Sequence, residues 1–299
     1  MPAVPGFEER EKQSAALTSL LAAVGLTAFK IIVGIATGSL GILAEAAHSG
    51  LDLVAAGMTL VAVRISGRPA DRTHLYGHGK IENLSALGET LLLLITCGWI
   101  VREAALRLLS HHVAIEVTGW SFGVMLTSIA IDISRSRVLA RAARKFKSQA
   151  LEADALHFQT DVWSSAVVIL GLAAVKAGEW YPPAAYLQNA DAVAALGVCI
   201  LVVWVSVQLG RRTIDALMDR APEGMEERIL AAVEVVPGVR NCHNLRMRYS
   251  GPVLFIDLHA LMDGDQSLTE AHLLTETVEA AIHEVAPEAD VTVHPEPYC

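Results

Sequence analysis

Two stretches of the chain carry the same pattern of residues, acid-Ala-x-His-x-x-x-Asp. The first runs from Glu45 to Asp52 and the second from Asp154 to Asp161. A histidine and an aspartate four residues apart share one face of a helix, so each copy offers one nitrogen and one oxygen to the same side. Two such faces opposed to each other give a tetrahedral set of ligands suited to Zn²⁺. The predicted ligands are His48, Asp52, His157 and Asp161.

Both copies lie within apolar segments, where ionisable groups are costly and are candidates for function by default. The alternative is a pair of structural polar contacts, and a single copy of the pattern would favour it. Repetition at equivalent positions of two segments favours the metal site instead. Glu45 and Asp154 lie one turn before each histidine, and we expect them to support the ligands or to contact other helices rather than to bind metal.

A second candidate site lies in a basic loop. Asp71, His74 and His78 follow each other at D-x-x-H-x-x-x-H spacing. The alternative interpretation is a solvated loop that carries two surface histidines.

A third group of candidate ligands lies near the C-terminus. It consists of His243, His259, His272, His294 and Glu296. Histidine and carboxylate ligands that converge suit Zn²⁺ or a similar borderline cation. Scattered surface histidines are the alternative here.

The composition indicates a polytopic membrane protein. The chain has 299 residues, of which 53% are hydrophobic and 18% charged, and its mean hydropathy is +0.43. Soluble domains average about 25% charged residues, so a soluble enzyme, a disordered chain and a nucleic-acid-binding protein are poor interpretations. Six apolar stretches have the length of about 20 residues that a membrane-spanning helix needs. They are residues 15–37, 40–65, 84–108, 118–142, 153–176 and 189–211.

The two copies of the motif lie in the second and fifth of these spans, the middle members of two three-span halves. Because three is odd, the halves cross the membrane in opposite directions, which is the inverted repeat that transporters use to build a site at the midplane. The loops after the second and fourth spans are basic, and basic loops remain in the cytoplasm. The sequence therefore predicts that both termini are cytoplasmic, with residues 1–14 as a short N-terminal segment and 15–211 as the membrane domain.

Residues 212–299 are predicted to form a separate cytoplasmic domain. Residues 220–299 carry 14 acidic side chains, five arginines and no lysine, and such a domain repels nucleic acid and attracts cations. Ordinary solubility is the alternative explanation of this charge. The pattern predicts a small α+β domain of order αββαβ, with its helices on one face of the sheet. The expected elements are a helix over 223–235, strands over 240–249 and 253–262, a helix from Ser267 to about 285, and a strand over 290–294.

These patterns together resemble the cation diffusion facilitator family, whose members are divalent-metal/proton antiporters. The resemblance runs from about Ser14 to His294 and is greatest to the bacterial ferrous-iron/zinc efflux type, whose metallochaperone-like cytoplasmic domain dimerises. Besides the paired motif, the resemblance rests on three short stretches. They are Gly38-Ser39-Leu40, Tyr76-Gly77-His78-Gly79-Lys80-Ile81-Glu82 and Leu268-Thr269-Glu270-Ala271-His272. The resemblance implies a homodimer in the inner membrane.

The resemblance also implies roles for individual residues. It matches the paired motif to the transport site, the loop group to a second site, and the four C-terminal histidines to a binuclear site of the cytoplasmic domain. Glu296 stands where that branch has aspartate. His48 also stands where the branch usually has aspartate, and histidine is typical of zinc-dedicated members. In relatives, Lys80 pairs with an acid just after the sixth span, which corresponds to Asp219 here and would clasp the dimer.

The expected function is therefore zinc export in exchange for protons, regulated by zinc binding to the cytoplasmic domain. A broader exporter of Cd²⁺, Co²⁺, Fe²⁺ or Mn²⁺ is the first alternative. A membrane metalloenzyme is the second, but a catalytic zinc keeps an open position, whereas the repeat offers four ligands and the chain has no HExxH. A metal sensor without transport is the third, and it would not need a six-span inverted repeat.

Overall fold

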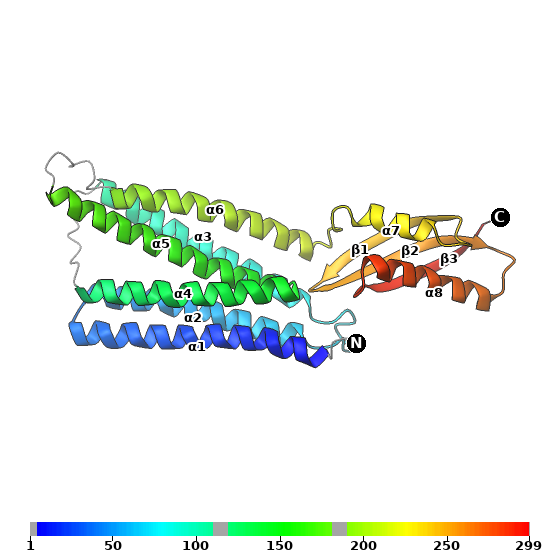
Figure 1. Ribbon diagram of the computed structural model, residues 1–299, viewed down its shortest axis with the longest axis horizontal. Helices are drawn as coiled ribbons and strands as arrows, with labels where there is room; N and C mark the ends of the chain where they lie inside the picture. Colours follow the sequence, from blue (N-terminus) through cyan, green and yellow to red (C-terminus); the bar gives the residue numbers. More distant parts are fainter. Residues whose placement is uncertain (1–4, 110–118, 181–189, 299) are drawn as a thin grey trace. The chain divides into compact units, whose positions relative to one another are not determined.

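The computed structural model describes residues 5–109, 119–180 and 190–298 (Figure 1). By its contacts the chain divides into two compact units. The helical unit consists of Met1–Arg68 and Ile81–Thr213, and the C-terminal unit consists of Pro69–Lys80 and Ile214–Cys299. The loop that carries Asp71, His74 and His78 thus belongs to the C-terminal unit.

The first part of the chain forms six long helices (Figure 1). The α1 helix packs against α2 and α4, α4 packs against α5, and α2 also contacts α5. Each helix overlaps one of the six apolar stretches predicted from the sequence. The helices are α1 (Pro5–Thr37), α2 (Leu40–Ser66), α3 (Lys80–Leu109), α4 (Gly119–Phe146), α5 (Gln149–Trp180) and α6 (Ala190–Leu217).

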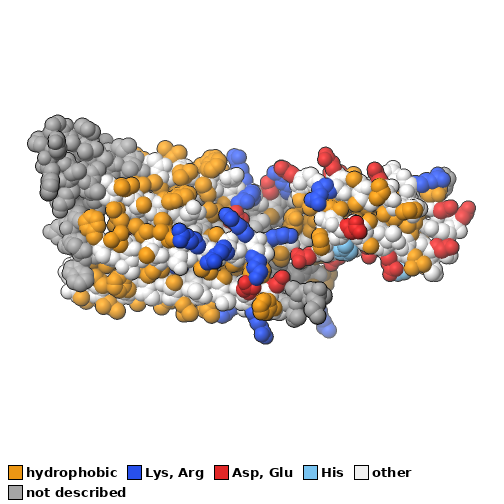
Figure 2. Space-filling view, in the orientation of Figure 1, with side chains coloured by type: hydrophobic (Ala, Val, Ile, Leu, Met, Phe, Trp, Pro, Cys, Tyr) orange, Lys and Arg blue, Asp and Glu red, His pale blue; other side chains and the backbone are white. Residues whose placement is uncertain are grey.

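Four stretches of the described residues are long and apolar enough to cross a membrane. They are Gly6–Thr37, Glu45–Ser66, Lys80–Arg102 and Leu196–Leu217. The six-span count therefore stays a prediction, because parts of the loops beside α4, α5 and α6 lie outside the described residues and α4 carries several charges in its second half. Figure 2 shows apolar side chains over the surface of the helical unit, as expected where a helix faces lipid.

The turn between α1 and α2 explains the Gly38-Ser39-Leu40 stretch. Gly38 has a φ of 65°, a left-handed conformation that glycine adopts without a steric penalty. Ser39 follows as the N-cap of α2, and its side chain accepts a hydrogen bond from the backbone N–H of Ile42. A serine at this position satisfies one of the otherwise unpaired N–H groups of the helix. The turn therefore fixes where the motif-bearing helix begins.

The carboxylate of Glu82 joins several parts of the helical unit. It is 1% exposed and lies in the first turns of α3. Nζ of Lys12, from α1, lies 3.1 Å from its Oε1, and Oγ of Ser66, at the end of α2, donates to the same oxygen at 2.8 Å. Ser148, just before α5, contacts Oε2. Four segments are thus held at one buried group.

The C-terminal unit is a small two-layer domain of order αββαβ, as predicted. It contains α7 (Met225–Glu234), β1 (Asn241–Ser250), β2 (Val253–Asp263), α8 (Leu268–Val285) and β3 (Asp290–Tyr298). The sheet has the order β1-β2-β3, with β1 antiparallel and β3 parallel to β2. The helices contact each other and share one apolar core with the sheet.

Alternation along β2 determines which face is covered. Leu254, Ile256, Leu258, Ala260 and Met262 are buried in the core, whereas the residues between them are more exposed. Because side chains of a strand alternate between faces, the intervening positions point to the face that the helices leave open. The sheet therefore has one apolar face and one face available for polar side chains.

The last strand is longer than predicted. It runs from Asp290 to Tyr298 rather than ending near His294. Pro295 and Pro297 lie within the strand, and proline cannot donate a backbone hydrogen bond. However, β3 is an edge strand paired only with β2, and proline is tolerated on edge strands. The extension keeps Glu296 on the sheet beside His294.

Candidate metal centres

The helical unit brings residues of the two motif copies together. Asp52 on α2 and His157 and Asp161 on α5 each offer a ligand atom within 4.8 Å of the others. Nε2 of His157 lies 3.2 Å from Oδ1 of Asp52 and 3.6 Å from Oδ2 of Asp161. Asp52 and His157 are buried. One nitrogen and two carboxylates at this spacing form a group that can hold a divalent cation.

His48 is the fourth predicted ligand and lies outside this group. It is on α2, one helical turn before Asp52, and its side chain is half-buried. Residues four apart share a helix face, so the helix places His48 on the side of Asp52. The structure thus gathers three of the four predicted ligands.

The acids that precede each histidine contact α1, as expected for interhelical partners. Glu45 pairs with Nζ of Lys30 at 3.0 Å, and the same ammonium group donates to Oγ of Ser49 at 2.7 Å. Asp154 accepts a hydrogen bond from Oγ of Ser19 at 3.4 Å. The two acids therefore tie the motif-bearing helices to α1.

The side chains of Asp71, His74 and His78, the loop group, also lie close together. Nε2 of His78 lies 3.4 Å from Oδ2 of Asp71, and Nδ1 of His74 lies 3.5 Å from Oδ1. Backbone N–H groups of His74 and Thr73 donate to Oδ1 of Asp71 at 2.7 and 2.8 Å. These hydrogen bonds hold the pKa of Asp71 well below its usual range, and the one from the backbone of His74 has the largest effect. The carboxylate is thus ionised at neutral pH, as a metal ligand must be.

The C-terminal unit holds this loop in place. The ring of Tyr76 packs edge-on against Phe255 on β2, and the guanidinium of Arg248 lies 4.1 Å from the centre of the Tyr76 ring. Gly79 passes so close to the backbone of Ser250 that a Cβ there would lie 2.4 Å from the carbonyl oxygen. Only glycine fits at this position, which explains why a glycine precedes Lys80 in the sequence.

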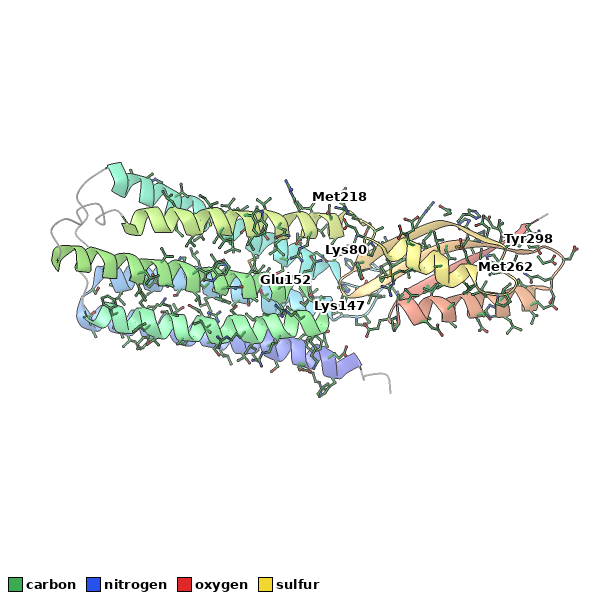
Figure 3. All side chains as sticks on the ribbon, turned by 45° about the horizontal axis from the view of Figure 1, so that its top comes forward. Lys80, Lys147, Glu152, Met218, Met262 and Tyr298 are labelled. Atoms are coloured by element: carbon green, nitrogen blue, oxygen red, sulfur yellow. The ribbon has the colours of Figure 1, made fainter. Side chains whose placement is uncertain are left out.

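Lys80 and Asp219 form the ion pair that the resemblance implied. Nζ of Lys80 lies 2.7 Å from Oδ1 of Asp219, and Nη1 of Arg248 lies 3.7 Å from Oδ2. Asp219 has a φ of 60°, a conformation in which aspartate and asparagine are enriched. The pair joins the loop to the segment after α6; Figure 3 labels Lys80 and Met218, the residue before Asp219.

The third group lies on the open face of the sheet. His243, His259 and His294 occupy adjacent positions on the three strands. Oε1 of Glu296 lies 2.7 Å from Nδ1 of His259, and Oε2 lies 3.2 Å from Nε2 of His243. The hydrogen bond from His259 lowers the pKa of Glu296. His243, His259 and Glu296 offer ligand atoms within 4.8 Å of one another, and the ring of His294 lies 4.7 Å from that of His259.

His272 is separated from this group. It lies on α8, which packs against the other face of the sheet, and its nearest charged partner is Oε1 of Glu276 at 3.7 Å. The side chain is 70% exposed. Within one chain, therefore, the strands gather the C-terminal ligands and the helix carries His272 away from them.

Sequence reasoning did not single out several buried ionisable residues of the helical unit. Glu89, Lys30, Asp132 and Arg135 are all buried. The feature that could have identified them is a charged residue inside an apolar stretch, because such a residue is a candidate for function. Their partners come from other helices, so spacing along the chain did not reveal them.

Comparison with known protein families identifies the chain. Residues 16–218 match the cation efflux transmembrane domain and residues 221–298 match the cation efflux protein cytoplasmic domain. The chain belongs to the cation efflux family, also called the cation diffusion facilitators. It is therefore a multi-pass membrane transporter that exports cations, and not an enzyme.

Relatives span nearly the whole chain. The cation-efflux pump FieF of Cronobacter sakazakii is 36% identical over 95% of this chain and 92% of the relative. FieF of Serratia proteamaculans has the same identity and coverage. Among solved structures, the MamM CTD with a methionine-to-leucine substitution is 34% identical, and the match covers 25% of this chain and 96% of that structure's chain, with a TM-score of 0.24.

Proposed function

We propose that this transporter exports Zn²⁺ from the cytoplasm in exchange for protons. The observation that carries the proposal is the group of Asp52, His157 and Asp161, which joins the two copies of the repeated motif between α2 and α5. The site contains imidazole, a borderline ligand that suits Zn²⁺ better than Mn²⁺. His48, one turn before Asp52, would supply a second nitrogen.

Exchange for protons follows from the chemistry of these ligands. An imidazole binds metal only when the coordinating nitrogen carries no proton, so metal binding and proton binding oppose each other at the same atoms. Histidine titrates close to neutral pH, where a small difference in pH changes its occupancy. Protons that enter from outside would therefore help to discharge the metal.

We further propose that the protein works as a homodimer with both termini in the cytoplasm. The match to the cytoplasmic domain of cation efflux proteins supports this arrangement. Zinc binding to the groups around Asp71 and Glu296 would regulate transport rather than carry it, because both groups belong to the C-terminal unit. Export of Cd²⁺, Co²⁺ or Fe²⁺ is the alternative if the site accepts several divalent cations.

Zinc flux in proteoliposomes tests the proposal. Vesicles that contain the full chain are loaded with Zn²⁺, and a proton gradient opposed to the zinc flux is imposed across the membrane. We expect the proton gradient to accelerate zinc movement, and we expect zinc movement to dissipate the proton gradient. Zinc flux that ignores the proton gradient would contradict antiport. Equal transport of Mn²⁺ and Zn²⁺ would favour the broader exporter.

A further inference from the structure

Glu89 is a buried acid of the helical unit and belongs to none of the three candidate metal sites described above. It lies on α3 and is 0% exposed. Its Oε1 contacts Oγ1 of Thr59 on α2, and its Oε2 has no hydrogen-bond partner among the described residues. None of the ion pairs in the described part of the chain includes Glu89.

The hydrogen-bond partner of Glu89 carries no charge. The hydroxyl of Thr59 donates to Oε1 of Glu89, and the same hydroxyl lies 3.3 Å from the carbonyl oxygen of Ala55, one turn earlier on α2. A hydroxyl provides a hydrogen bond but no positive charge to balance an ionised carboxylate. An ionised carboxylate without a cation would be costly in this interior, so the neutral acid fits the site.

No cation forms an ion pair with Glu89 among the described residues. On α2 it faces the uncharged hydroxyl of Thr59, and one turn earlier on α3 Ala86 packs with the apolar Leu209 of α6. The ionisable groups that act on it are Asp154 and His157, both on α5. Ser85, one turn earlier on α3, is a second hydroxyl that acts on Glu89.

Asp154 is the other fully buried acid nearby, and its situation differs. Its Oδ2 accepts from Oγ of Ser19 at 3.4 Å, and the guanidinium of Arg135 donates to the same hydroxyl at 3.2 and 3.3 Å. Asp154 therefore has a cation close by, through one shared hydroxyl. Glu89 has no such arrangement among the described residues, and this difference favours Glu89 as the neutral acid.

We propose that Glu89 is a proton-binding site of the transporter. It is protonated while the transport site is empty and loses its proton to solvent when Zn²⁺ occupies the group around His157. The divalent charge of the metal adds positive charge near Glu89, and a nearby positive charge favours the ionised carboxylate. The use of this proton in transport rests on the proposed antiport, whereas the change in protonation does not.

Infrared difference spectroscopy tests the protonation change directly. Spectra of the full chain in lipid vesicles are recorded before and after the addition of Zn²⁺. We expect zinc to remove a carbonyl band of a protonated carboxylic acid, and we expect that band to be absent from Glu89→Gln. A band of the same intensity in Glu89→Gln would overturn the proposal.

A matched control separates this effect from a general loss of charge. Glu152 lies in the first turn of α5 (Figure 3), where its Oε1 accepts from Nη2 of Arg212 at 2.7 Å. Because this acid is already ion-paired and partly exposed, Glu152→Gln should leave the band unchanged. Thr59→Val provides a second variant that keeps Glu89. Loss of the hydroxyl should shift the band to higher frequency, and an unshifted band would also overturn the proposal.

Proton counting gives an independent readout. Zn²⁺ is added to the protein in weak buffer, and the protons released are measured with a pH-sensitive dye. Glu89→Gln should release up to one proton fewer per zinc bound, and the slope of log zinc affinity against pH should fall by the same amount. Unchanged release and slope would contradict the proposal. Zinc flux insensitive to a proton gradient would instead refute antiport while leaving the infrared band of Glu89 in place.

Discussion

Nε2 of His157 lies 3.2 Å from Oδ1 of Asp52, although 105 positions separate the two residues in the sequence. The hydrogen bond joins the second copy of the repeated motif to the first. It also uses the nitrogen atom that would coordinate a metal at this site. A cation that binds here must therefore replace the proton between His157 and Asp52, so the contact itself links metal binding to proton movement.

The first prediction concerns Asp161. Asp161→Asn removes the charge but keeps the shape, and a neutral amide is a poor ligand compared with a carboxylate, so zinc binding at the membrane site and transport should both be lost. Zinc per chain is measured in a background in which His78→Ala and His259→Ala have disabled the other two groups. Asp257→Asn, at an exposed position of β2, is the control. Retained stoichiometric zinc in Asp161→Asn would show that the site lies elsewhere.

The second prediction concerns metal selectivity. His48→Asp replaces a borderline nitrogen by a harder oxygen, which should raise Mn²⁺ transport relative to Zn²⁺. The ratio of the two initial rates is measured in vesicles. His283→Asp, a change of the same type at an exposed position of α8, should not alter the ratio. If the ratio is also unchanged in His48→Asp, His48 does not contact the transported ion.

The third prediction concerns the group on the open face of the sheet. His243→Ala combined with His259→Ala should lower the zinc bound per chain and weaken the response of transport to zinc. It should not abolish transport, because the membrane group stays intact. Zinc content and flux are measured on the same preparation, with His283→Ala as the control. A folded dimer that no longer transports would make this group obligatory and refute a regulatory role.

Local patterns predicted much of this molecule. The four-residue spacing of histidine and aspartate, repeated in two apolar segments, identified the residues that α2 and α5 bring together. Ser267 and Glu270 predicted the start of α8, where their reciprocal capping hydrogen bonds are present. Alternation predicted β1 and β2. Each of these features depends on neighbours within a few residues.

Contacts between distant segments were not predictable in the same way. Lys12 and Glu82 are 70 positions apart, and nothing near either residue indicates the other. The separation of His272 from the other C-terminal histidines follows from which face of the sheet α8 covers, and residue types do not encode that. The Lys80–Asp219 pair was foreseen only through the family resemblance.

The fourth prediction separates charge from backbone conformation at Asp219. Lys80 and Asp219 are each more than a third exposed, so their ion pair should contribute less than about 1 kcal/mol. Asp219→Asn keeps a residue that tolerates positive φ and should cost only that much, whereas Asp219→Ala adds strain of roughly 1–2 kcal/mol at a φ of 60°. Amide hydrogen exchange of the loop over residues 69–80 measures both. Equal losses of stability in Asp219→Asn and Asp219→Ala would mean that the positive φ of residue 219 does not contribute to the difference.

The last prediction concerns the buried ion pair between Lys12 and Glu82. Lys12→Met removes the ammonium group but keeps much of the apolar stem, which leaves the Glu82 carboxylate buried with only hydroxyl partners, Ser66 and Ser148. Breaking a buried pair in this way costs about 3–5 kcal/mol. Thermal unfolding of the full chain in detergent should show this loss.

A double variant tests the reason for the loss. Glu82→Gln in the Lys12→Met background removes the uncompensated charge and should restore much of the lost stability. Lys145, whose Nζ lies 2.6 Å from Oε2 of Glu11 in a largely exposed pair, supplies the control, and Lys145→Met should cost less than about 1 kcal/mol. If Lys12→Met unfolds at the same temperature as Lys145→Met, the carboxylate of Glu82 does not depend on Lys12, and α1 is held to α3 by other contacts.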